Sequence, residues 1–137
     1  MRRNPRKRYL SPEQHPVIQR LMRWARKADV YLWDVAHRFC PEVEKSHLEK
    51  KRVYAHTFHD GKNICWCQDA MHDLTPNQLA GICLHEYGHL LAGNRKSSYE
   101  AEKAADLVLM ERFGIEMSYR GKNLVQWVNL KKVMRGI

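Results

Sequence analysis

Long apolar runs are missing from this chain of 137 residues, in which uninterrupted apolar stretches last only a few residues. A helix that spans a bilayer needs about 20 consecutive apolar residues, so the sequence predicts no membrane-spanning segment. The basic N-terminus is also not followed by the apolar stretch that a secretory signal contains. We therefore expect a cytoplasmic protein without a membrane partner.

The four cysteines form no CxxC pair. Their scatter is typical of reduced thiols in the cytosol. Cys65 and Cys67 are two residues apart and would share one face of a strand, which leaves a second metal site or a redox role as an alternative.

Internal repeats are also absent, and 44% apolar with 28% charged residues is ordinary for one folded domain. The charge is uneven, because five cations and no acid fall in the first ten residues, so that the formal charge of +9 drops to +4 without them. We predict a basic tail over residues 1–10 and a single domain over residues 11–137. The tail cations are Arg2, Arg3, Arg6, Lys7 and Arg8.

Such a tail attracts phosphates with a salt-dependent affinity, which makes nucleic acid a candidate partner. The simpler interpretation is a solubilising terminus, since no DNA-reading motif accompanies the tail. The oligomeric state is left open by the sequence.

His85, Glu86 and His89 form an HExxH motif. On an α-helix, residues four apart lie on one face, so both imidazoles can bind one Zn²⁺ while Glu86 points toward a zinc-bound water. Zinc lowers the pKa of that water to about 7, and the glutamate takes its proton as it attacks a carbonyl. The motif predicts one Zn²⁺ per chain and a zinc-dependent peptidase, with Glu86 as the general base and a peptide or protein as substrate.

The flanks of the motif indicate a helix. Thr75 is a suitable N-cap, Pro76 follows at N1 and Gln78 stands at N3. The apolar run from Leu79 to Ala92 comes next, and Gly93 supplies the usual stop. We therefore expect HExxH to lie inside a helix bracketed at both ends.

A catalytic zinc usually takes three protein ligands, and no His or Cys follows His89. A downstream carboxylate is the simplest third ligand. The candidates are Glu100, Glu102, Asp106, Glu111 and Glu116.

Ser97 and Glu100 form a capping-box pattern, so Glu100 is expected to bond the N-cap amide of a second helix that Gly114 ends. Glu102 is then the better zinc ligand, with Glu100 as its main competitor. Asp106, one turn after Glu102, can hold a zinc-bound imidazole in its correct tautomer.

This arrangement of HExxH followed by Glu102, Ala105 and Asp106 resembles the gluzincin metallopeptidases. It is closest to the minimal gluzincins and the ImmA/IrrE-type peptidase domains, whose second helix carries Glu-x-x-Ala-Asp/Asn. The similarity covers about residues 50–115. The Phe-Ala that follows in the ImmA type is replaced by residues 107–109, and the third histidine usual in the SprT-like group is absent.

The resemblance implies that His85, His89 and Glu102 bind zinc, Glu86 is the base and Asp106 supports a ligand. It implies an α+β, zincin-like fold: a small antiparallel or mixed sheet packed on the HExxH helix, a second zinc-ligand helix, and flanking N- and C-terminal helices.

Residues 52–58 and 64–68 are rich in branched and aromatic side chains and flank an Asp60-Gly61 pair, which predicts a hairpin. In gluzincins the strand edge beside the active-site helix binds an extended peptide by β-augmentation. By resemblance, the candidate substrate strand is Ile64, Cys65, Trp66, Cys67 and Gln68. The alternative is a strand paired within the sheet.

Elsewhere, residues 17–28 predict an amphipathic helix. Residues 29–39 fit either a helix or a strand, and we favour a helix that Pro41 ends. Residues 115–119 predict a short strand, and apolar positions from Leu124 to Val133 indicate a final helix.

Two further functions compete with the peptidase. One is a nucleic-acid-associated regulatory or DNA-repair protein with a restrained or DNA-dependent zincin domain. The other is a zinc-stabilised binding module, against which Glu86 argues, because a structural site needs no general base. For the group that stabilises the oxyanion, Tyr54, His56, Tyr99 and Tyr119 remain equivalent candidates.

Overall fold

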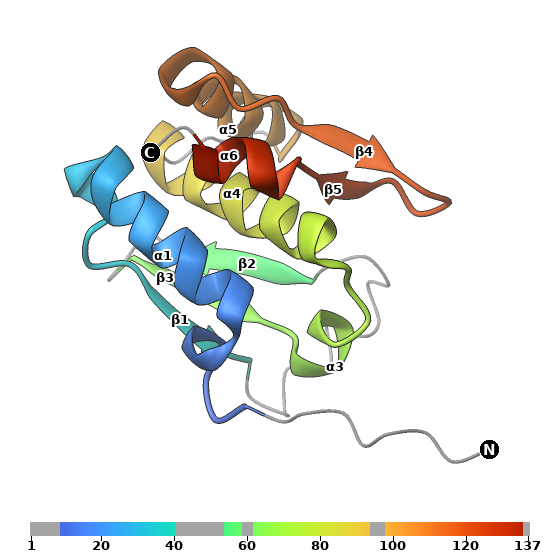
Figure 1. Ribbon diagram of the computed structural model, residues 1–137. Helices are drawn as coiled ribbons and strands as arrows, with labels where there is room; N and C mark the ends of the chain where they lie inside the picture. Colours follow the sequence, from blue (N-terminus) through green and yellow to red (C-terminus); the bar gives the residue numbers. More distant parts are fainter. Residues whose placement is uncertain (1–8, 41–53, 59–61, 94–97, 136–137) are drawn as a thin grey trace.

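The computed structural model describes residues 9–40, 54–58, 62–93 and 98–135. Its central element is helix α4 (Pro76–Ala92), with a three-stranded sheet on one side and α5 (Ser98–Phe113) on the other (Figure 1). Helix α1 (Pro16–Ala28) also packs against α4. The mixed α+β class predicted from the sequence is confirmed.

The sheet has the order β1-β3-β2. Its strands are β1 (Ala36–Phe39), β2 (Ala55–Phe58) and β3 (Asn63–Trp66), with β1 parallel and β2 antiparallel to β3. The predicted pairing of β2 with β3 is confirmed, whereas residues 52, 53 and 59–61 lie outside the described part of the chain.

The position of β3 contradicts the expected substrate strand. β3 is paired on both sides, so its main-chain groups are used within the sheet and offer no edge to a peptide. Ile64, Cys65 and Trp66 belong to β3, but Cys67 follows it and Gln68 begins the short helix α3 (Gln68–Met71). Among the described strands, β1 and β2 form the edges.

The helix favoured for residues 29–39 is also wrong. Asp29 is extended at the end of α1, and its carboxylate accepts the Tyr31 amide, which starts a 3-10 turn, η2 (Val30–Leu32). The chain then enters β1, whose pairing partner lies far along the sequence. Local propensity could not reveal that pairing.

Helix α1 follows the prediction and is preceded by the 3-10 turn η1 (Pro12–Gln14). Its buried face includes Ile18, Leu21 and Trp24. The ring of Trp24 meets that of Phe113 edge-on at 5.1 Å, which links α1 to the end of α5.

Both ends of α4 form as expected. Thr75 and Gln78 make a reciprocal capping box, and Gly93 ends the helix at a φ of +80°. Gly114 likewise ends α5 at a φ of +66°, where the Ile115 amide bonds the Leu109 carbonyl at 3.2 Å. The predicted capping residue Ser97 lies outside the described residues.

The C-terminal region differs from the prediction. Strands β4 (Ser118–Arg120) and β5 (Val125–Trp127) form an antiparallel pair, and only α6 (Leu130–Arg135) is helical. The predicted short strand is therefore shifted toward the C-terminus, and the predicted final helix is wrong in its first half. Leu124, at a φ of +52°, belongs to the turn between the strands.

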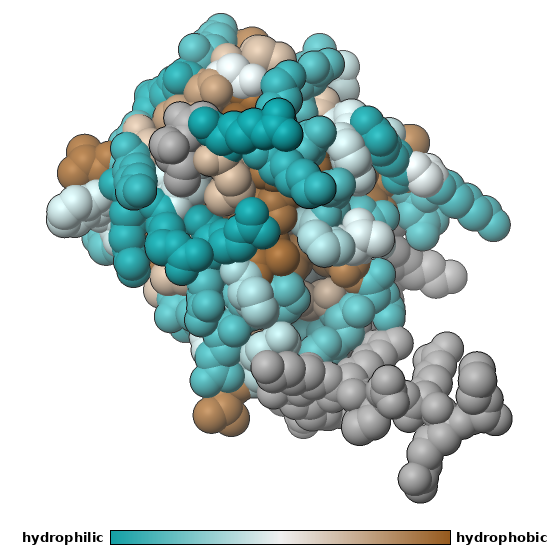
Figure 2. All heavy atoms as spheres, viewed as in Figure 1, coloured by the Kyte–Doolittle hydropathy of each residue, from teal (hydrophilic) through white to brown (hydrophobic). Residues whose placement is uncertain are grey.

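The hydrophobic core surrounds α4. The face of the molecule seen in Figure 2 is largely hydrophilic, with scattered apolar side chains. No helix among the described residues is long and apolar enough to cross a bilayer.

Candidate functional site

The site is built where α4 and α5 cross closely. A Cβ on Gly88 would lie 2.4 Å from the Ala105 carbonyl oxygen, so only glycine permits this approach. Ala105 is itself fully buried. The contact between these two small residues brings Glu102, one helical turn before Ala105, toward the histidines of α4.

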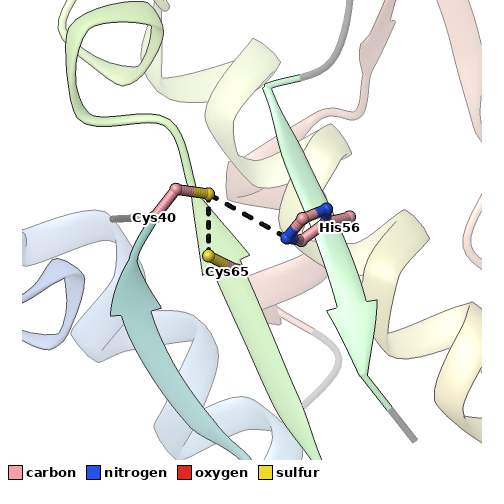
Figure 3. A group of neighbouring side chains, drawn as sticks. All are labelled: Cys40, His56 and Cys65. Carbon is pink, nitrogen blue, oxygen red and sulfur yellow. Dashed lines mark hydrogen bonds between the residues drawn. The ribbon is translucent and has the colours of Figure 1, made fainter. Parts of the chain in front are cut away.

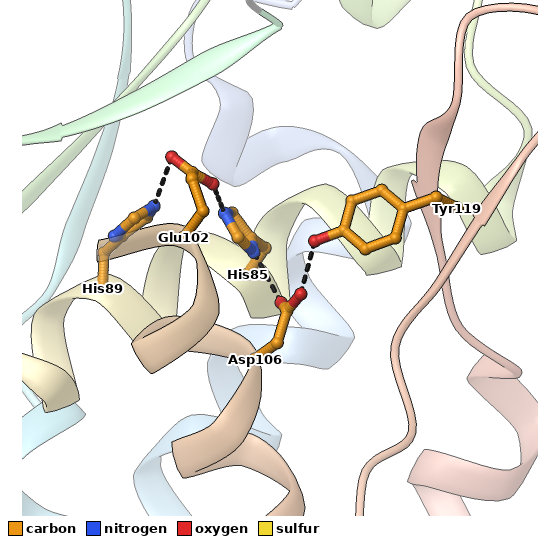
Figure 4. A network of polar contacts seen from close by, with 5 residues as sticks. All are labelled: His85, His89, Glu102, Asp106 and Tyr119. Atoms are coloured by element: carbon orange, nitrogen blue, oxygen red, sulfur yellow. Dashed lines mark hydrogen bonds and ion pairs between the residues drawn. The ribbon is translucent and has the colours of Figure 1, made fainter. Parts of the chain in front are cut away.

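Three potential metal ligands converge in this crossing (Figure 4). One donor atom from each of His85, His89 and Glu102 lies within 4.8 Å of the other two. His89 Nε2 is 3.3 Å from one Glu102 oxygen, and His85 Nε2 makes a short contact with the other. Two histidines and one glutamate are a donor set that catalytic zinc sites use. Glu100 is exposed and does not join this group.

Asp106 links His85 to a residue of strand β4, which follows α5 in the chain. One of its oxygens lies 2.7 Å from His85 Nδ1, and the other accepts a hydrogen bond from the Tyr119 hydroxyl. The carboxylate therefore sets the His85 tautomer, leaving Nε2 to face Glu102. Of the four candidates for oxyanion stabilisation, the structure brings Tyr119 to this network on β4.

Glu86 is buried beside the histidines, with only 5% of its surface exposed. Its Oε2 has no hydrogen-bond partner among the described residues. Burial raises the pKa of Glu86 to about 7, although positive charge on His85 and His89 opposes the shift. A buried carboxylate oxygen without a partner is costly in a purely structural role and is what a general base needs.

The charges around the histidines favour a cation. Burial lowers the pKa of His85, but hydrogen bonds to Asp106 and Glu102 outweigh it and raise the value to about 10. Hydrogen bonds to His85 and His89 hold the pKa of Glu102 well below its usual range. The carboxylates thus stabilise positive charge between them, which protons or a divalent ion can supply, and the residues present fit Zn²⁺.

The residue after Glu86 anchors the helix to the sheet. Tyr87 is 1% exposed, and its hydroxyl lies 2.9 Å from His37 Nε2 on β1. Trp66 Nε1 donates to His37 Nδ1 at 3.0 Å, so neutral His37 carries its proton on Nε2 and donates to Tyr87. Burial lowers the pKa of His37 to about 3, which keeps the ring neutral.

Sequence reasoning missed His37, because nothing local distinguishes it from other histidines. The predicted basic tail residues Arg2, Arg3, Arg6, Lys7 and Arg8 lie outside the described part of the chain.

Comparison with protein-family models, with curated proteins and with solved structures found no match. What the site does must therefore be inferred from its own side chains.

Proposed function

We propose that this chain is a zinc-dependent peptidase of gluzincin type with a zincin-like fold. His85, His89 and Glu102 would hold one Zn²⁺. The observation that carries the proposal is this set of three ligands beside the buried, unsatisfied carboxylate of Glu86. A bound Zn²⁺ would lower the pKa of water and polarise the substrate carbonyl.

The protein side chains have distinct tasks in hydrolysis. Glu86 accepts a proton from the attacking water and passes it to the amine that leaves when the C–N bond breaks. Asp106 holds His85 through Nδ1, and Tyr119 holds Asp106. Through these contacts both residues would position His85.

The substrate is best accommodated at β2, not at β3. β2 is an edge strand among the described residues and packs against α4. An extended peptide can add to such an edge through main-chain hydrogen bonds. In NMR titrations of the Glu86→Gln variant with a peptide, the amide signals of residues 55–58 are expected to shift. Shifts confined to β4 and β5 would place the substrate elsewhere.

The decisive test separates metal binding from hydrolysis. Glu86→Gln is expected to keep the zinc content of the parent but to slow cleavage of a quenched-fluorescent peptide library about 10²–10⁴-fold. His89→Ala is expected to lose one zinc equivalent and all cleavage. Glu111→Gln, an exposed glutamate on α5, serves as the control and should match the parent. Equal rates for Glu86→Gln and the parent would refute the mechanism.

A further inference from the structure

A second group of metal-binding side chains lies on the sheet. Cys65 is on β3, His56 is its register partner on β2, and Cys40 directly follows β1. The Cys40 amide still bonds the Trp66 carbonyl at 2.8 Å, which continues the pairing of β1 with β3. Two strands and the residue that directly follows the third therefore contribute one side chain each, and Figure 3 shows the three side chains turned toward one another.

This group faces away from the HExxH helix. Side chains alternate between the two faces of a strand, and the neighbours of Cys65, Ile64 and Trp66, are buried in the core that surrounds α4. Cys65 lies on the opposite face and is nevertheless 2% exposed, while Cys40 and His56 are half-buried. The group is thus a separate, sheltered site.

The distances suit a common ion. Cys40 Sγ lies 2.7 Å from Cys65 Sγ and 3.9 Å from His56 Nε2, and all three atoms lie within 4.8 Å of one another. Tetrahedral zinc, with bonds of about 2.3 Å to sulfur and 2.0 Å to nitrogen, places two sulfurs roughly 3.8 Å apart and sulfur and nitrogen roughly 3.5 Å apart. The two thiols need to separate by only about 1 Å, which small side-chain rotations provide.

We propose that Cys40, His56 and Cys65 form a second metal site that binds Zn²⁺ through two thiolates and one imidazole. Thiolate and imidazole favour zinc over magnesium or calcium, which prefer oxygen. The ion ties together three strands, including β2, and leaves one tetrahedral position for a further donor. The site uses none of the residues of the HExxH site.

Cobalt spectroscopy of the full chain tests this site alone. The reduced, metal-free protein is titrated with Co²⁺, and sulfur-to-cobalt charge-transfer absorption in the near ultraviolet is expected to saturate once both sites are filled, at about two equivalents in the parent and about one in His89→Ala. The HExxH site contains no sulfur and is silent in this band. Cys40→Ser should abolish the band, whereas Cys67→Ser, which alters a half-buried cysteine outside the group, should keep it.

The zinc content per chain gives an independent count of the metal sites. The parent is expected to hold about two zinc ions, His89→Ala and Cys40→Ser about one each, and the double variant none. Absence of the thiolate band in the parent would overturn the proposal, even if a variant failed to fold. A Cys40–Cys65 disulfide, detected by thiol titration and peptide mass mapping, would overturn it equally. Because His89→Ala should keep the band, failure of the peptidase proposal leaves this result unaffected.

Discussion

The positions of two glutamates on α5 determine which of them can serve as a metal ligand. Glu102 contacts both histidines, whereas Glu100, two residues earlier, lies outside this group. The capping-box pattern in the sequence favoured this choice, since it gave Glu100 another task. The Tyr119 contact to Asp106 had no such signal, because it joins a helix to a strand beyond the next turn.

Substitution of Glu102, Asp106 and Glu100 should therefore change the zinc affinity to different extents. Glu102→Gln removes a charged ligand and is expected to weaken zinc binding more than Asp106→Asn, for which a loss of about 10–100-fold is expected. Glu100→Gln is the control and should bind as the parent does. Competition with a chromophoric chelator measures these affinities. It is done in a Cys40→Ser background, which removes the proposed second zinc site of Cys40, His56 and Cys65. Equal losses in Glu100→Gln and Glu102→Gln would contradict the assignment.

His37 should make stability depend on pH. Its pKa of about 3 in the folded chain lies below the ordinary value of 6.5, so the unfolded chain takes up a proton first as the pH falls. The stabilisation is complete above pH 6.5 and is lost toward pH 3. At pH 5 the loss is about 2 kcal/mol.

Denaturant unfolding in EDTA at pH 7, 6 and 5 measures this effect. His37→Gln does not titrate at this position and should be less stable than the parent at pH 7, and this difference should shrink by about 2 kcal/mol at pH 5. The raised pKa values of Glu86 and His85 stabilise both proteins as the pH falls and cancel in the comparison. The titratable groups that face His37 are Tyr87, through its hydroxyl, and Glu13, whose carboxylate accepts the His37 amide at 3.0 Å. An equal change of stability with pH in both proteins would contradict the role of His37.

At the scale of elements, the helices with local caps were predictable and the strands with distant partners were not. The start and end of α4 are encoded by Thr75, Gln78 and Gly93, which lie within the helix or directly beside it. β1 follows a 3-10 turn and depends on β3 for its hydrogen bonds. The local sequence of this segment is therefore equally compatible with a helix. β5 likewise needs β4.

One methyl group added at Gly88 should disturb the packing of α4 against α5. Gly88→Ala would place its Cβ against the Ala105 backbone and push α5 away, with an expected cost of about 1–3 kcal/mol and a loss of zinc affinity. Thermal unfolding and zinc titration measure the two effects.

Gly81→Ala is the matched control. A Cβ there would lie 2.5 Å from the Trp127 amide nitrogen of β5, so a similar steric cost arises away from Glu102. We expect this variant to be destabilised but to keep its zinc affinity. If both variants lose zinc alike, the loss reflects general unfolding and not the displacement of α5.

At the scale of the whole molecule, the charge is divided between the first residues and the domain. Five cations lie within residues 1–8, and the remaining chain has a formal charge of only +4 out of +9. This imbalance keeps nucleic acid as an alternative partner, in which case the proposed peptidase would act near DNA.

Replacing the five tail cations by glutamine tests that alternative while keeping the length of the chain. Binding to duplex DNA should weaken, and the slope of log K against log salt should flatten by at most about 4.5, or 0.9 for each lost phosphate contact. Fluorescence anisotropy at several salt concentrations measures both. An unchanged titration would remove nucleic acid as a partner of the tail.

The sequence alone determined the HExxH helix, its caps and the spacing that puts Glu102 one helical turn before Ala105. These features depend on residues within a few positions of one another, where helical geometry is fixed. The tertiary structure decided that β3 is central and that Tyr119 reaches Asp106. It also brought Cys40 to Cys65, 25 residues away, because strand order and register follow from packing that no local pattern encodes.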